Sequence, residues 1–412
     1  MTEYFIRRLL LAVPTFFIST LIVFGIVQGA PGGPLEQQLQ QLKNQTAEQG
    51  GGSALGQAEI PPSEVAKLER YYHFHEPFFI RYLIWLGLWQ RNELDFNVTI
   101  GEPRKIGGGQ RAVVEESAPG QYRVLDANDR TRVLPNWEVE MMAVDGEEPQ
   151  PRLVKKAYAG ILTFYFGESF QYNEPVGDLI AERFPVSFQF GLIGFILAYT
   201  VCIYMGILKA LNHGGAFDFG TSVIVFIGYS IPGWALGAVM LVLFGGGSFL
   251  DLFPLGNFQS ENYLELSLFD KFLDRAYHFV LPTIAYTIAQ FATLTMLTKN
   301  SLLENLSKDY VRTAFAKGLR EKRVVWVHAL RNSLIPIASR IGGVIGLFVA
   351  SSYLIELVFN IDGLGKLSFQ AILARDYNIV FAFAVISVIL LILGQMLSDL
   401  ALSFVNPRIR FK

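Results

Sequence analysis

Long uncharged apolar stretches alternate with polar segments along the chain. A membrane-spanning helix needs about 20 mostly apolar residues, because hydrocarbon offers the backbone no water to bond. Five stretches meet this requirement: residues 9–35, 184–208, 219–250, 276–298 and 377–398. A sixth candidate, 335–358, carries Arg340 and Glu356 near its ends, where they could reach the interface or face a cavity. The pattern predicts an all-α polytopic membrane protein with six transmembrane helices.

The first apolar stretch, 9–35, has some features of a secretory signal, since Arg7 and Arg8 precede it. Its apolar run is long for a signal, however, and Pro31 would follow the cleavage point. We therefore expect residues 1–30 to form a retained N-terminal transmembrane helix.

Basic residues are distributed unequally between the short loops, and this asymmetry sets the direction of the helices. Arg7 and Arg8 precede the first stretch, and eight basic residues fall in 299–334. The loop 251–275 instead holds five acidic residues and two basic ones. The pattern places both termini and the loops 209–218 and 299–334 in the cytoplasm, and 251–275 outside.

The segment 31–183 is the predicted extracytoplasmic part, and it holds 22 of the 36 acidic residues. Within it, residues 91–156 contain turn signals and short β-type runs such as 112–114 and 122–125. The expected result is a small β-rich extracytoplasmic subdomain. No catalytic constellation stands out there, which favours a docking or spacing module over an active site.

Composition supports a membrane protein and excludes several other classes. Hydrophobic residues make up 51% of the 412 residues and charged residues only 17%, against about 25% in soluble domains. The net charge of −2 gives no reason to expect a nucleic-acid partner. Cys202 is the single cysteine, and His73 and His75 are the only close pair of histidines. We therefore predict no metal site and no catalytic residues.

The segment 299–336 combines basic charge with two apolar patterns at helical spacing. Gly318 separates the patterns and is expected to end a helix. The first pattern comprises Leu302, Leu303, Leu306, Tyr310, Ala314 and Ala316, and the second comprises Val324, Val325, Val327 and Leu330. Periodicity alone leaves two interpretations open: a short helix that offers a surface to a partner, or a basic loop bound to lipid headgroups.

Motifs in this segment and elsewhere resemble the membrane subunits of ABC importers of the oligopeptide/dipeptide branch. The segment reads DYVRTAFAKG at 309–318, HALRN at 328–332 and LIP at 334–336. Further matches are YFIRRL at 4–9, PGGP at 31–34, PVGDLIAERFP at 175–185, DGLG at 362–365, RDY at 375–377 and NPRI at 406–409. LTMLTKN at 294–300 and GGGS at 245–248 are similar to the subgroup that imports microcin C-type peptides. The resemblance covers 1–90 and 157–412, so 91–156 is expected to be an insertion.

The resemblance implies a type I ABC importer fold, with 184–412 as a five-helix permease core and 299–334 as its cytoplasmic coupling loop. It implies import of peptides or modified peptides across a bacterial plasma (inner) membrane. The implied partners are a second permease subunit (a paralogue), two ABC ATPase subunits or one fused ATPase, an extracytoplasmic solute-binding protein, and membrane lipid.

The chain itself lacks the phosphate-binding pattern Gly-x4-Gly-Lys-Ser/Thr, to which Gly365-Lys366 is the nearest approach. We therefore expect no enzyme activity and no cofactor on this chain, with ATP and Mg²⁺ bound by the partner ATPase subunits.

The resemblance assigns ATPase coupling to the segment 309–323, a short helix and turn that would seat in a groove of the ATPase. Tyr310, Val311 and Ala314 are expected to fill the groove, Lys308, Arg312 and Lys317 to pair at its rim, Gly318 to permit a tight turn, and Asp309 and Arg323 to bound the segment. The general family has Glu-Ala-Ala where this chain has Arg312, Thr313 and Ala314.

Polar residues inside the apolar stretches are candidates for the translocation pathway, each with the alternative of a satisfied buried polar group. They are Gln189, Tyr229, Ser230, Gln290, Thr293, Ser351 and Ser352. Glu356 is expected at the outer mouth, where it could bind a peptide amine or pair with an arginine. Gly342 and Gly346 form a Gly-xxx-Gly pair that packs either against the partner permease or inside the subunit.

Two other classes of function remain as alternatives. A secondary transporter driven by an ion gradient would need buried ionisable residues inside the spans, which contain almost none. A receptor that binds a ligand through its outer segment would predict uptake without this chain. A P-loop ATPase that co-purifies with the chain would distinguish the importer from both.

Overall fold

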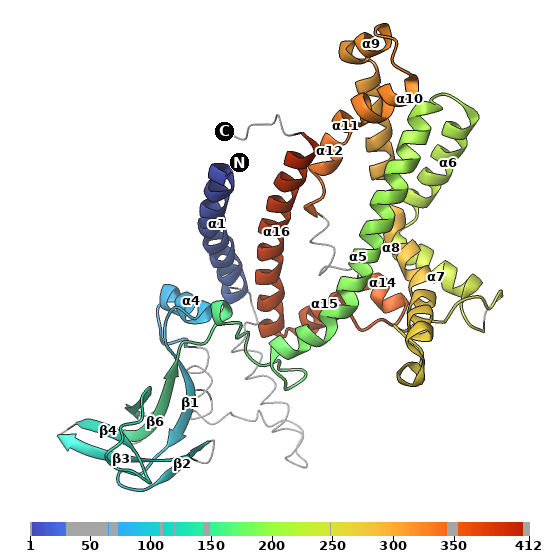
Figure 1. Ribbon diagram of the computed structural model, residues 1–412. Helices are drawn as coiled ribbons and strands as arrows, with labels where there is room; N and C mark the ends of the chain where they lie inside the picture. Colours follow the sequence, from blue (N-terminus) through green and yellow to red (C-terminus); the bar gives the residue numbers. More distant parts are fainter. Residues whose placement is uncertain are drawn as a thin grey trace. The chain divides into compact units, whose positions relative to one another are not determined.

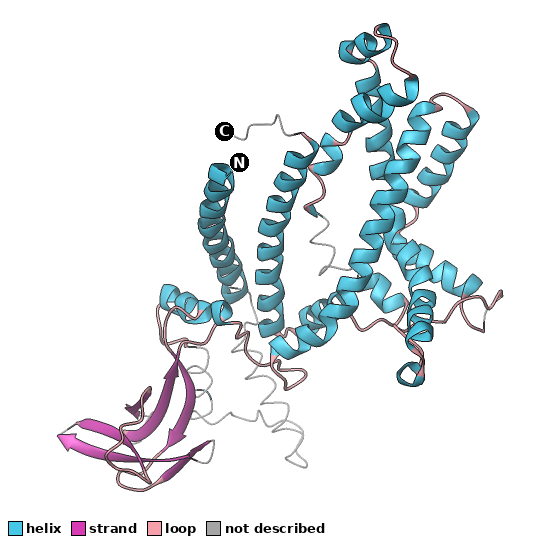
Figure 2. Ribbon diagram, viewed as in Figure 1, coloured by secondary structure: helices cyan, strands magenta, loops and turns pink. Residues whose placement is uncertain are grey.

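The chain forms two compact units, each described here by itself. The structure is a computed structural model that describes residues 2–29, 65, 73–107, 110–118, 120–142, 149–247, 249–343 and 353–406. One unit comprises Met1–Thr20 and Asp178–Lys412, and the other comprises Leu21–Gly177. The first unit is helical and the second contains the strands (Figures 1 and 2). A mostly helical fold with small sheets was predicted and is confirmed.

The helical unit is built mainly from a few long apolar helices and several short ones. In chain order they are α1 (Thr2–Gly29, shared with the second unit), α5 (Val176–Leu211), α6 (Ala216–Ser230), α7 (Gly233–Phe244), the 3-10 turn η2 (Tyr263–Glu265), α8 (Leu268–Leu306), α9 (Asp309–Ala316), α10 (Glu321–Arg323), the π-helical turn η3 (Val324–Ala329), α11 (Leu330–Ser333), α12 (Ile335–Ala338), α14 (Tyr353–Val358), α15 (Leu364–Ala374) and α16 (Tyr377–Val405).

Three single helices are long and apolar enough to cross a membrane: Ile6–Gly29, Val176–Leu211 and Tyr377–Val405. They coincide with the first, second and last predicted stretches. The helix α8 also qualifies, as Leu268–Ile288 and Gln290–Leu306 with a bend of 55° between them. The helices α6 and α7 form a second bent pair of this kind. If each bent pair counts as one span, the described residues hold up to five spans.

The third predicted stretch, 219–250, is not one continuous helix. Its residues form α6 and α7, which meet at an angle of 99°. Pro232 causes the break, because proline has no N–H and disfavours helical geometry in the residue before it. Accordingly, Ile231 is extended, with φ −98° and ψ 124°.

The start of α1 and the end of α16 lie at the same end of the helical unit (Figure 1). The Arg8 Nε and Asp399 Oδ2 atoms, one on each helix, form an ion pair at 2.9 Å. Arg331 on α11 donates from Nε to the Val405 carbonyl at 3.0 Å. We call this the coupling end, because α9 and α11 both belong to the predicted coupling loop 299–334.

The sixth predicted span, 335–358, is described only at its two ends. The helix α12 packs on the second half of α16, whereas α14 packs on α15, which leads into the first residues of α16. The chain therefore passes from one end of α16 to the other between α12 and α14. Residues 344–352, in the middle of this passage, lie outside the described residues.

The second unit contains two antiparallel three-stranded sheets with the orders β1-β6-β5 and β2-β3-β4. The strands are β1 (Arg91–Asn97), β2 (Arg104–Gly107), β3 (Gln110–Ala118), β4 (Gln121–Asp126), β5 (Trp137–Met142) and β6 (Gln150–Ala157). In the register of the two sheets, Val114 pairs with Val124 and Val139 pairs with Leu153. These inward-facing residues share one core with Ile106, Ala112 and Leu134. The strands predicted at 112–114 and 122–125 are confirmed as parts of β3 and β4.

The second unit also contains a helical part, formed by α4 (Phe78–Leu86), the 3-10 turn η1 (Ile161–Thr163) and the last residues of α1. Phe24 of α1 is buried, and its ring lies 5.2–5.6 Å from the rings of Phe78, Tyr82 and Trp85. The packing of these four aromatic rings, of which Phe24 and Tyr82 are buried, holds α4 against the end of α1.

Candidate functional site: the coupling end and the cavities behind it

The helix α9 is a short amphipathic helix that ends in a left-handed turn. Asp309 lies in its first turn, where a carboxylate is favoured by the helix dipole. Gly318 has φ +76°, and Leu319 N–H donates back to the Ala314 carbonyl at 3.3 Å. Only glycine, and to a smaller extent asparagine, adopts this conformation readily. The turn predicted at Gly318 is present.

One face of α9 is fixed to the helical unit by a hydrophobic cluster. Val311 and Ala314 are 1% and 7% exposed. They pack against α5, α8 and the segment that follows Gly318, and we call this set the α9 anchoring cluster: Ile207, Ala210, Leu302, Val311, Ala314, Val324, Ala329 and Leu330. Because Val311 and Ala314 are buried within this chain, they cannot fill a groove of a partner, and that part of the prediction is wrong.

The opposite face of α9 is exposed and combines aromatic and basic side chains. Tyr310 is 39% and Phe315 46% exposed. Lys308 pairs with Glu304 at 3.0 Å and Arg312 with Asp309 at 3.6 Å, both on the surface. The remaining predicted coupling residues, Lys317, Gly318 and Arg323, are also exposed.

Two exposed apolar side chains, Phe315 on α9 and Trp326 on η3, had no place in the coupling site predicted from sequence. Trp326 is 43% exposed although it lies in an apolar run. Spacing alone could not have identified Phe315, because it lies four residues after buried Val311 and residues four apart are neighbours on one helix surface. Together with Tyr310 these residues give this end an aromatic surface, a type of residue common at protein interfaces.

A buried ion network joins α5, α6 and α8 next to the α9 anchoring cluster. Lys299 Nζ bonds both carboxylate oxygens of Asp218 at 2.8 Å. Lys209 is fully buried, lies 3.3 Å from Asp218 Oδ1, and donates to Thr221 and Ser222 on α6. Two ammonium groups, from Lys209 and Lys299, thus face the Asp218 carboxyl. Residues from three helices are thereby fastened at one point.

Glu356 is buried, and backbone amides hold its carboxylate. Its oxygens accept hydrogen bonds from Lys366 N–H at 2.6 Å and Gly365 N–H at 3.4 Å, at the first turn of α15. Ser187 on α5 donates to Glu356 at 3.3 Å and accepts from Leu364 N–H at 2.8 Å. Glu356 therefore satisfies the amide groups of a helix N-terminus. Neither of the expected partners, a peptide amine or an arginine, is among these contacts.

We expect Glu356→Ala to lower the free energy of unfolding by about 1–3 kcal/mol, because two amide groups lose a buried acceptor. Glu356→Gln keeps one acceptor oxygen and is expected to lose less. Thermal unfolding of the detergent-solubilised chain measures both changes. The assignment would be contradicted if Glu356→Ala were as stable as the parent. It would also be contradicted if Glu356→Ala lost no more stability than Glu356→Gln.

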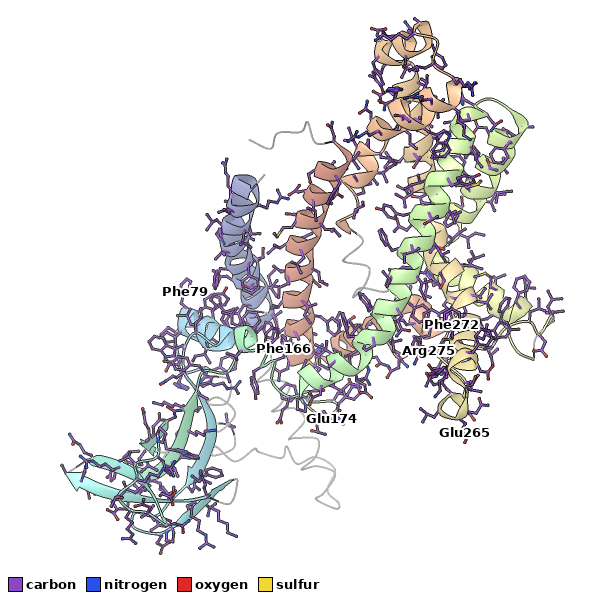
Figure 3. The ribbon with its side chains drawn as sticks, viewed as in Figure 1. Phe79, Phe166, Glu174, Glu265, Phe272 and Arg275 are labelled. Carbon is purple, nitrogen blue, oxygen red and sulfur yellow. The ribbon has the colours of Figure 1, made fainter. Side chains whose placement is uncertain are left out.

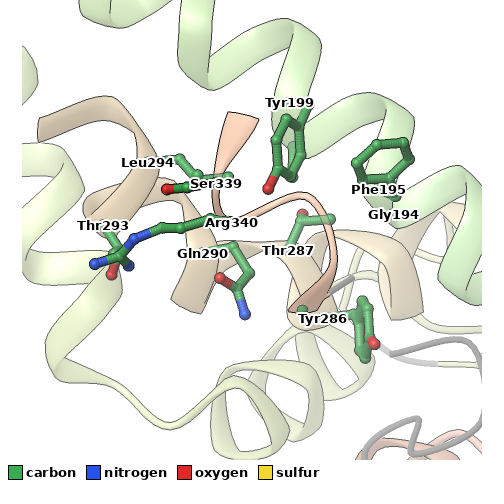
Figure 4. Close-up of a pocket in the computed structure, with 12 residues that line it drawn as sticks. Gly194, Phe195, Tyr199, Tyr286, Thr287, Gln290, Thr293, Leu294, Ser339 and Arg340 are labelled. Carbon is green, nitrogen blue, oxygen red and sulfur yellow. The ribbon is translucent and has the colours of Figure 1, made fainter. Parts of the chain in front are cut away.

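Among the predicted pathway residues, Gln290 and Thr293 line the same cavity. This cavity, of about 390 Å³, lies between α5, α8 and the residues after α12, and Tyr199 and Arg340 also line it (Figure 4). Gln189 lines a second cavity, of about 800 Å³, between α5 and the first half of α8. Phe272 and Arg275 belong to the lining of this second cavity (Figure 3).

Two other predicted pathway residues, Tyr229 and Ser230, are not among the residues that line these cavities. Tyr229 and Ser230 are exposed near the break between α6 and α7, and Ser230 Oγ donates to the Phe226 carbonyl. Ser351 and Ser352 lie outside the described residues.

Gly342 packs inside the subunit. A Cβ atom added to Gly342 would collide with the Gly394 backbone of α16, and Gly342 N–H donates to Ser398 Oγ at 2.8 Å. Such close backbone approach is what small residues permit between membrane helices. Of the two alternatives for the Gly-xxx-Gly pair, Gly342 thus takes internal packing, while Gly346 lies outside the described residues.

Comparisons with known proteins place this architecture in a defined class. Residues 202–411 match the family described as "Binding-protein-dependent transport system inner membrane component". The chain is 34% identical to the "Peptidoglycan transport system permease protein YejB" of Agrobacterium fabrum, covering 100% of this chain and 99% of the relative. It is 33% identical to the "Inner membrane ABC transporter permease protein YejB" of Escherichia coli O157:H7 and 27% identical to the "Oligopeptide transport system permease protein AppB" of Bacillus subtilis, each over 100% of both chains.

The fold and these matches define a multi-pass membrane permease of an ABC importer. The chain belongs to the binding-protein-dependent transport system inner membrane component family, in its oligopeptide/dipeptide branch. Members of this family are membrane components and not themselves enzymes, and they work in systems with ATPase and binding-protein partners. The predicted family, permease role and non-enzymatic nature are confirmed, whereas the likeness to the microcin C-type subgroup stays a prediction.

Proposed function

We propose that this chain imports peptides or modified peptides and forms the translocation pathway together with a second, paralogous permease. Two ABC ATPase subunits, or one fused ATPase, bind ATP and Mg²⁺ and drive the cycle, and this chain binds no cofactor. A solute-binding protein delivers the peptide on the extracytoplasmic side. The names of the relatives, which refer to oligopeptide, dipeptide and peptidoglycan transport, support this substrate class.

The observation that carries the proposal is the two-sided character of α9. Its inner face is held by the α9 anchoring cluster, and its outer face exposes Tyr310 and Phe315 between basic residues. A short helix transmits movement only if it is rigidly joined to one body and exposes a contact surface to another. In this proposal the exposed aromatic face seats in the ATPase, and Lys308, Arg312 and Lys317 pair with acidic groups at the rim of its groove.

The proposal places the coupling end in the cytoplasm. Basic residues are concentrated in 299–334 and flank the first span at Arg7 and Arg8. The ion pair between Arg8 and Asp399 brings the start of α1 to the end of α16, so the amino and carboxyl termini lie on the cytoplasmic side with α9. The β-rich segment then belongs to the outer side, where docking of the solute-binding protein is its proposed role.

Purification of the importer through a tag on this chain tests the proposal. We expect a P-loop ATPase to co-purify and Phe315→Glu to reduce its recovery at least about tenfold, because a charge replaces an aromatic contact in the interface. Phe249→Glu is the matched control, since Phe249 is 84% exposed in the loop after α7, and this loop lies away from α9 (Figure 1). Absence of the ATPase from the parent preparation would favour a secondary transporter or a receptor, and equal recovery with Phe315→Glu would reject this contact surface.

A further inference from the structure

The cavity lined by Gln290 and Thr293 lies at the middle of the two longest helices of the unit. It is bounded by residues 194–199 of α5, by residues 286–294 of α8 and by the chain at 339–343 (Figure 4). Gln290 precedes Lys299 of the ion network by nine residues, or roughly 14 Å along the helix. The cavity is therefore set well inside the membrane-spanning part and not at its coupling end.

Arg340 is the one charged residue among those that line this cavity. Its side chain is exposed and extends toward Thr293 (Figure 4). None of the lining residues that the structure describes carries a carboxylate. An arginine inside a membrane-spanning segment is costly, and such residues mark substrate or ion pathways.

The groups around Arg340 are suited to a peptide. Gln290 offers an amide and Thr293 and Ser339 offer hydroxyls, which can bond a peptide backbone. Phe195 and Tyr286 provide aromatic walls. The volume of about 390 Å³ falls within the range of small-molecule sites. Guanidinium groups bind carboxylates through two parallel N–H donors, so the ligand that this lining favours is a short peptide with a free carboxylate.

We propose that Arg340 binds a carboxylate of the transported peptide at a transient site within the membrane-spanning part of the chain. This inference rests on the proposed peptide-import function. The carboxylate comes from the peptide C-terminus or from an acidic side chain, and the two sources share the same chemistry at the guanidinium. Arg340 thus acts as a specificity-determining residue within the permease, in addition to any selection by the solute-binding protein.

Uptake by the complete importer, reconstituted in vesicles with its ATPase and saturating binding protein, tests this site. The substrates are trialanine, trialanine amide and Ala-Asp-Ala amide, and uptake by each variant is divided by uptake of the same peptide by the parent. For Arg340→Met we expect uptake of trialanine to fall about tenfold or more, with trialanine amide unchanged, because only the acid loses a charged hydrogen-bond partner. A similar fall in uptake of Ala-Asp-Ala amide would show that the site also binds side-chain carboxylates. Unchanged uptake of this peptide would show that the site binds only the C-terminal carboxylate.

Two controls separate this site from general damage. Arg340→Lys keeps the charge but not the two parallel donors, and we expect an intermediate loss for the acid peptide. Arg275→Met removes an arginine from the other cavity and should leave the acid-to-amide ratio unchanged. Equal loss of acid and amide uptake in Arg340→Met, or no loss of either, would overturn the inference. Failure of the parent importer to take up any peptide would instead reject the proposed function.

Discussion

Asp218→Ala is expected to lower the free energy of unfolding of the helical unit by about 3–5 kcal/mol, the cost of leaving a buried charge without its partner. Asp218 is the carboxylate that Lys209 and Lys299 share, and the Lys209 side chain is fully buried. Without the carboxylate, two ammonium groups from α5 and α8 face each other with no counter-charge. Thermal unfolding of the purified chain, followed by circular dichroism, measures the change.

Two further variants define what this result means. Glu304→Ala removes an exposed ion pair with Lys308 and should change stability by less than about 1 kcal/mol, because water screens surface pairs. Asp218→Ala combined with Lys209→Met and Lys299→Met removes every charge of the network and should recover much of the loss. If Asp218→Ala were as mild as Glu304→Ala, the network would not hold the three helices together.

Gly318→Val is expected to abolish peptide uptake while leaving the chain folded. Gly318 has φ +76°, and among the described residues, its two chain neighbours aside, no atom lies within 4 Å of a Cβ placed there. Valine therefore meets no clash within the chain, but it disfavours the left-handed backbone by about 1–2 kcal/mol. The turn would relax to another conformation and carry the exposed face of α9 away from its position. Peptide uptake and peptide-stimulated ATPase activity of the reconstituted importer measure the loss.

Gly318→Asn separates backbone conformation from contact. Asparagine tolerates the left-handed region far better than valine, so it should retain most of the uptake. Equal loss in both variants would mean that a partner surface packs directly against Gly318, since each adds a Cβ atom. Normal uptake by Gly318→Val would reject the coupling role of this turn.

The features that depend on local sequence could be predicted. The apolar runs of α1, α5 and α16 follow from length and lack of charge, and the strands β3 and β4 follow from β-type residues between turn signals. The turn at Gly318 follows from a glycine at the end of an amphipathic pattern. The break between α6 and α7 is also local, since Pro232 lies in the middle of the third stretch. It was overlooked because the stretch was chosen only by its lack of charged residues.

The features that were missed depend on partners distant in sequence. Lys299 bonds Asp218 across 81 residues, and Ser187 bonds Glu356 across 169. A charged residue beside an apolar stretch gives the same sequence pattern whether its side chain faces water or another helix. For the same reason, periodicity found the apolar stripe of α9 but not its direction, and Val311 and Ala314 were assigned to the wrong side.

The way α9 is fastened has a consequence for the transport cycle. Its buried face and the neighbouring lysine–aspartate network fix the ends of α5 and α8, and the middle of these same two helices forms the walls around Arg340. In the proposed function, a tilt imposed on α9 is therefore passed through the ends of α5 and α8 to the walls of this cavity. The shape of the cavity around Arg340 should then change together with the nucleotide state of the proposed ATPase. Uptake of substrate without ATP hydrolysis should therefore be rare.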